Sequence, residues 1–82
     1  MNTATWRDEA RKAVDRLQSV RDEIRVQLHL AGMDAKDRWR DLEPRIQEVT
    51  DRLAREGSEG AKAAFHELME ELRTFRASLE RH

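Results

Sequence analysis

Hydrophobic residues recur at helical spacing through the first two thirds of the chain. On a helical projection at about 100° per residue they fall within a sector of roughly 100°. The members of this row, here called the core stripe, are Trp6, Ala10, Ala13, Leu17, Val20, Ile24, Leu28, Ala31, Ala35, Trp39, Leu42, Ile46, Val49 and Leu53. Their mean spacing of about 3.6 residues is typical of a nearly straight helix and not of a strict coiled-coil seam. The pattern therefore predicts one helix over about residues 4–55.

Gly32 and Pro44 disfavour helix within this span. A proline in a helix interior costs about 3 kcal/mol, because it lacks a backbone donor and clashes with the preceding turn. The core stripe keeps its phase on both sides of Pro44, so we expect a kink near Pro44. Two alternatives stay open: a new helix that starts there with Asp41 as its cap, and a break at Gly32.

The segment REGSEG at residues 55–60 predicts a stop, a turn and a second start. Gly57 suits the left-handed position after a helix, and Ser58 suits the N-cap of the next one. We expect a turn at 56–58 and a second helix over about 59–81. Its own apolar row consists of Ala61, Phe65, Leu68, Leu72, Phe75 and Leu79.

The two predicted helices differ in length, roughly 75 Å against about 35 Å at 1.5 Å per residue. In a helical hairpin the shorter helix would place Phe75 opposite Trp39 and cover only half of the core stripe. Exposing the large residues of the other half would forfeit about 7–15 kcal/mol, which rivals the stability of a small domain. The sequence therefore predicts an all-α fold in which two such hairpins form an antiparallel homodimeric helical bundle. The long helices would cross near residue 30, and a tetramer is the alternative.

The segment IRVQLHL at residues 24–30 is apolar on two faces. Val26, Leu30 and Met33 lie nearly opposite the core stripe, and a helix with two apolar faces packs on both sides. This second row could complete the dimer, join two dimers or receive another protein. A β-strand is the competing interpretation of the alternation, but no turn signals flank the segment. The residues that we expect at an oligomer or partner interface are Trp6, Leu17, Val20, Ile24, Val26, Leu28, Leu30 and Met33.

Composition supports a helical protein and limits its chemistry. Charged residues make up 40% of the 82 positions, with three Gly and one Pro, as in long helices. The 16 Lys and Arg nearly balance the 17 Asp and Glu, so the basic excess of nucleic-acid-binding proteins is absent. The sequence has no Cys, which excludes disulfides and thiolate metal sites.

Histidine gives the only hints of a reactive site. His66 and Glu70 stand at metal-ligand spacing on one helical face, but off the apolar row and without a third ligand. His29 is flanked by Leu28 and Leu30, where protonation near pH 6 could bias an interface; an exposed side chain without a role is the alternative. We find no nucleophile or phosphate-binding motif, and expect no enzyme activity, no cofactor and no metal.

These observations favour a non-enzymatic interaction protein, acting as a self-associating scaffold, adaptor or regulatory partner. The alternative is an amphipathic protein that binds a lipid surface, although its polar face is as acidic as it is basic, whereas such helices are usually rich in Lys and Arg. No run of about 20 apolar residues and no signal-peptide core occur. We therefore expect a cytoplasmic protein.

Overall fold

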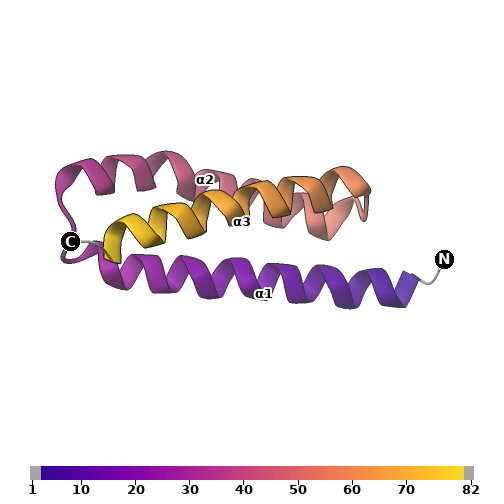
Figure 1. Ribbon diagram of the computed structural model, residues 1–82. Coiled ribbons are helices and arrows are strands. Elements are labelled where there is room, and N and C mark those ends of the chain that lie inside the picture. The colour runs from indigo at the N-terminus through magenta and orange to yellow at the C-terminus, as the bar shows by residue number, and fades with distance from the viewer. Residues whose placement is uncertain (1–2, 81–82) are drawn as a thin grey trace.

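The computed structural model describes residues 3–80 as three helices packed side by side (Figure 1). Helix α1 spans Thr3–Leu28, α2 spans Met33–Arg55 and α3 spans Glu59–Glu80. Consecutive helices are antiparallel, so α1 and α3 run in the same direction. Residues 3–80 include no strand, and the all-α prediction is confirmed. Residue 81, which the sequence assigns to the last helix, lies outside the described residues.

The structure corrects the prediction of a single helix over residues 4–55. The chain leaves the helix after Leu28 and starts α2 at Met33, with Gly32 as an extended N-cap (φ −76°, ψ 176°). This break lets α2 and α3 cover the α1 half of the core stripe. Full burial of a residue such as Leu17 or Ile24 contributes about 1.5–3 kcal/mol, whereas a helix through Gly32 is already weakened by about 1 kcal/mol.

Pro44 does not end a helix. Helix α2 runs through it, and its ring lies exposed on the side away from the core. The hypothesis that a new helix begins at Pro44 is therefore wrong. The helix boundary in this region falls instead at Gly32.

The turn between α2 and α3 has the predicted chemistry. Gly57 has a φ of +57°, and the backbone amide of Ala61 donates a hydrogen bond to Ser58 Oγ at 3.2 Å. The amide of Glu56 donates to the carbonyl of Arg52 at 2.8 Å and closes the last turn of α2. The roles predicted for Gly57 and Ser58 are thus confirmed.

The core is entirely apolar among the described residues. Its buried members are Ala10, Leu17, Ile24 and Leu28 of α1, Trp39, Ile46, Val49 and Leu53 of α2, and Ala61, Leu68, Met69, Leu72 and Phe75 of α3. The predicted pairing of Trp39 with Phe75 is confirmed, since the two rings stack with centroids 6.0 Å apart. One chain therefore buries all three of its apolar helix faces.

Candidate interaction surface at the α1–α2 turn

Three large apolar side chains remain outside this core, around the turn between α1 and α2. Val26 is 70% exposed, Leu30 94% and Met33 67%. We call these three residues the turn patch. They are the second apolar row predicted from the sequence. In the structure they lie at the end of the bundle where α1 connects to α2, and no other described part of the chain covers them.

The backbone of the turn explains the exposure of Leu30. The amide of Leu30 donates to the carbonyl of Gln27 at 3.2 Å, and the amide of Ala31 donates to that of Leu28 at 3.1 Å. These tight bonds between residues three apart end α1 in a 3₁₀-like turn. Leu30 stands at the outer side of this turn, while Ala31 packs against the core.

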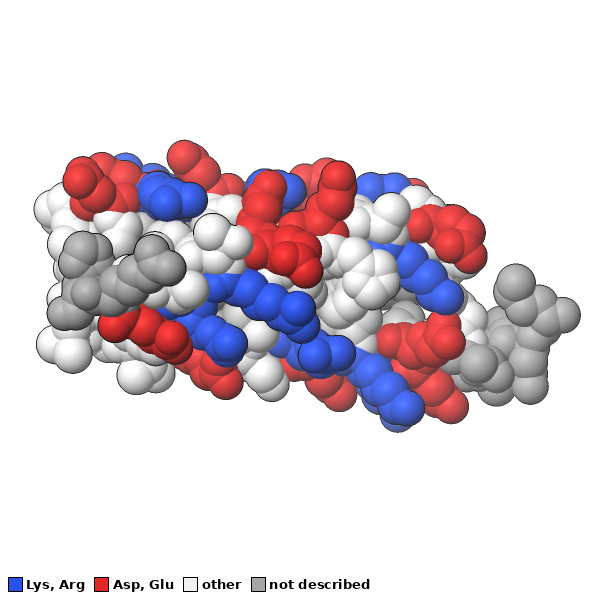
Figure 2. Space-filling model, in the orientation of Figure 1, with Lys and Arg blue, Asp and Glu red and all other residues white. Residues whose placement is uncertain are grey.

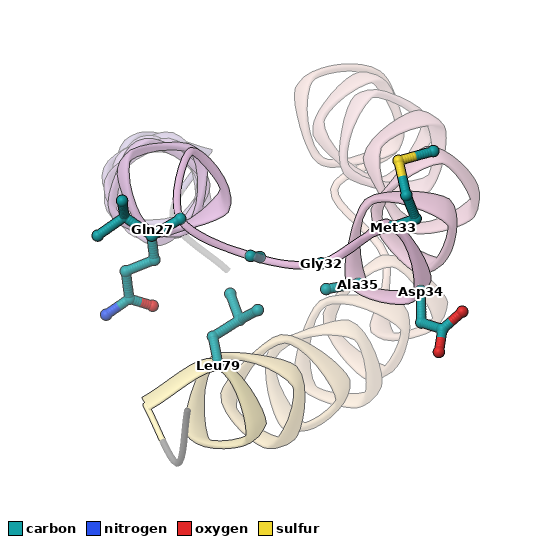
Figure 3. Close-up of a pocket in the computed structure, with 8 residues that line it drawn as sticks. Gln27, Gly32, Met33, Asp34, Ala35 and Leu79 are labelled. Carbon is teal, nitrogen blue, oxygen red and sulfur yellow. The ribbon is translucent and has the colours of Figure 1, made fainter.

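A shallow hollow of about 590 Å³ lies beside the turn patch. Its lining residues are Gln27, Leu30, Ala31, Gly32, Met33, Asp34, Ala35 and Leu79. Leu79 of α3 points toward the segment that joins α1 to α2, whereas Met33 and Asp34 point away from it (Figure 3). Its lining mixes the polar side chains of Gln27 and Asp34 with apolar side chains such as Leu30 and Leu79.

The other residues predicted at an interface lie inside the single chain. Leu17 and Ile24 are fully buried, Leu28 is buried, and Val20 packs partly buried against the core. Their burial by α2 and α3 removes the reason for expecting a second chain over the N-terminal half of the core stripe. The sequence kept a break at Gly32 only as an alternative, because the hydrophobic periodicity continues unchanged through residues 29–32.

Trp6 closes the opposite end of the bundle. Its indole lies so close to Gly57 that a Cβ added there would collide with the ring. Lys62 Nζ lies 5.5 Å from the centroid of the same ring and 3.1 Å from Glu9 Oε2. Trp6 is therefore a packing residue over the α2–α3 turn. It makes a cation–π contact with Lys62, which is itself paired with Glu9.

The charged surface carries both signs. Lys and Arg side chains lie next to Asp and Glu side chains on the face formed by α1 and α3 (Figure 2). Several pairs join different helices: Glu9–Lys62 and Glu23–Arg76 link α1 to α3, Arg25–Glu43 links α1 to α2, and Arg45–Glu71 links α2 to α3. Each of these pairs places opposite charges side by side, so the charges within the pairs neutralise one another locally.

Both histidines that stand out in the sequence, His29 and His66, are exposed in the structure. His66 and Glu70 are both exposed, and Glu70 pairs with Arg73 at 3.8 Å. His29 is exposed in the turn. Within residues 3–80 no group of three or more His, Asp or Glu side chains is placed to hold a metal ion.

The chain matches no protein-family description, no curated protein and no solved structure. Within the described part of the chain, no helix combines the length and the apolar character needed to span a membrane.

Proposed function

We propose that this chain is a small non-enzymatic interaction protein of the cytoplasm that self-associates through the turn patch. The observation that carries the proposal is the contrast between a closed apolar core and the nearly complete exposure of Leu30 beside Val26 and Met33. Full burial of a side chain of this kind contributes about 1.5–3 kcal/mol. A symmetric contact would bury each of these side chains twice, once in each copy.

A second copy of the chain is the simplest occupant of this patch. Arg25, next to Val26, already pairs with Glu43 within the chain at 3.3 Å, so the case for a second copy rests on the apolar side chains. A two-fold contact brings the same patch of both chains together, and each patch then covers the other. A scaffold, an adaptor and a regulatory partner would each use this surface.

The test is a single charge placed in the patch. Leu30→Glu should raise the dissociation constant of the turn-patch contact at least about tenfold, because it forfeits the burial of Leu30 in both copies. Helicity should stay unchanged, since Leu30 is outside the core. Light scattering gives the mass across a concentration series, and circular dichroism gives the helicity.

Gln18→Glu is the matched control, because Gln18 is an exposed residue of α1 away from the turn and the substitution adds the same charge. It should associate like the wild type. Equal masses for the Leu30 variant and the wild type at every concentration would contradict the turn-patch contact.

The lipid-surface alternative makes a different prediction. The core stripe is buried in the bundle, so a membrane could take it up only after the helices separate. We expect the mass and helicity of the wild-type protein to be unaffected by anionic phosphatidylserine vesicles. Co-sedimentation with these vesicles, together with a rise in helicity, would favour the alternative.

A further inference from the structure

The two turns of the bundle are built differently. The α2–α3 turn is fixed by the left-handed Gly57, by the Ser58 cap and by the Trp6 ring packed over it. The α1–α2 turn has none of these devices. No residue between Leu28 and Met33 has a positive φ, and Gly32 caps α2 without a side-chain hydrogen bond. Residues 29–32 can therefore become helical without relieving or creating backbone strain.

The core stripe is also in helical phase across this turn. Leu28, Ala31 and Ala35 follow one another at spacings of three and four residues, and all three pack against the core. A turn in a closed bundle places no requirement on the phase of the helix that follows it. A continuous helix does require this phase, because its apolar face must stay on one side.

We infer that two copies of the chain exchange α1 by opening the α1–α2 turn into helix. Each chain then has one long helix from α1 through α2, and the two long helices cross antiparallel near residue 30. The α1 of each copy packs on α2 and α3 of the other and makes the same core contacts as in the closed chain. This inference rests on the self-association proposed above. In the exchanged dimer the two chains meet through their cores, so the turn patch lies outside that contact and would join further copies.

Opening the turn also rearranges the turn patch. Val26, Leu30 and Met33 are spaced by four and three residues, so a continuous helix lines them up in one row. The row lies on the face opposite the core stripe, where it remains free to receive a further helix. The exchanged dimer would thus offer two such rows, one on each long helix.

The ion pairs between α1 and α3 allow exchange to be measured directly. Glu9 pairs with Lys62, and Glu23 pairs with Arg76. In the closed chain these pairs are intramolecular, whereas after exchange they join different chains. Two variants with complementary charge reversals therefore restore all four of these ion pairs only through exchange.

The first variant carries Glu23→Arg with Lys62→Glu, and the second carries Glu9→Lys with Arg76→Glu. Each variant keeps the formal net charge of −1, since one acidic residue becomes basic and one basic residue becomes acidic. Within each closed variant both pairs become like-charged, and in the exchanged heterodimer all four pairs are opposite. Native mass spectrometry of an equal mixture, in which one variant is isotope-labelled, gives the heterodimer fraction.

Exchange predicts a heterodimer fraction well above the statistical value of about half, because like-charge juxtaposition across an interface disfavours the wrong partner. A fraction of about half would show that the chains associate without exchange, and would overturn this inference alone. Monomers only, in the wild type as well as in the mixture, would overturn both this inference and the proposed function.

Gly32→Pro provides a second test that leaves the charges unchanged. Its closed turn has a φ of −76°, close to that of proline, and among the described residues the Gly32 amide donates no backbone hydrogen bond. The opened helix would contain the proline in its interior. Exchange predicts that this variant raises the dissociation constant of the dimer at least about a hundredfold. A dissociation constant equal to that of the wild type would overturn the inference of exchange.

Discussion

Gly57 and Gly60 show how differently two nearby glycines are constrained. Gly57 has a φ of +57°, and a Cβ there would strike the Trp6 indole. Gly60 lies within α3, where a Cβ would meet the end of the flexible Arg52 side chain at 3.2 Å. The same substitution therefore has opposite consequences at the two positions.

Gly57→Ala should lower the free energy of unfolding by about 1–3 kcal/mol, from the left-handed backbone and the displaced indole. Gly60→Ala should leave it unchanged or raise it by up to about 1 kcal/mol, since alanine favours helix. Urea unfolding followed by circular dichroism at a concentration where the protein is monomeric measures both. Equal losses in the two variants would contradict the packing of Trp6 over the turn.

At the scale of the helices, periodicity alone identifies the apolar faces but does not locate the turns. The start of α3 was predictable, because Gly57 and Ser58 have conformational preferences of their own. The break at residues 29–32 could be given only as an alternative, because the core stripe keeps its phase there and only Gly32 disfavours helix. Pro44 carries the stronger local signal, yet α2 continues through it with its ring turned to solvent.

Gly32→Ala tests the balance between the closed and opened forms of the α1–α2 turn. Alanine is a poor N-cap and a good helix former, so the substitution destabilises the closed turn and favours the continuous helix. A Cβ at Gly32 meets no atom within 4 Å, so no clash obscures the effect. We expect the dimer to strengthen by about tenfold or more, measured by sedimentation equilibrium. An unchanged or weaker dimer would contradict an opening turn.

At the scale of the whole molecule, the bundle is an elongated body of 46 × 17 × 15 Å with two unlike ends. Trp6 seals one end over the α2–α3 turn, while the turn patch exposes apolar side chains at the other. Val26, Leu30 and Met33 could be predicted as a separate surface because they lie off the core stripe. Leu17, Val20 and Ile24 could not be told apart from interface residues, because whether they are covered depends on where the chain turns back.

The most direct measurement is the mass of the untagged wild-type protein over a wide concentration series, with circular dichroism on the same samples. A core closed within one chain predicts full helicity at the lowest concentrations, where the mass is that of one 9.7 kDa chain. The proposed self-association predicts a rise toward about twice that mass at higher concentrations, without further gain of helix beyond the few residues of the α1–α2 turn. Helicity that is low in the dilute samples and rises in step with the mass would contradict a core closed within one chain, and a single-chain mass at every concentration would contradict self-association.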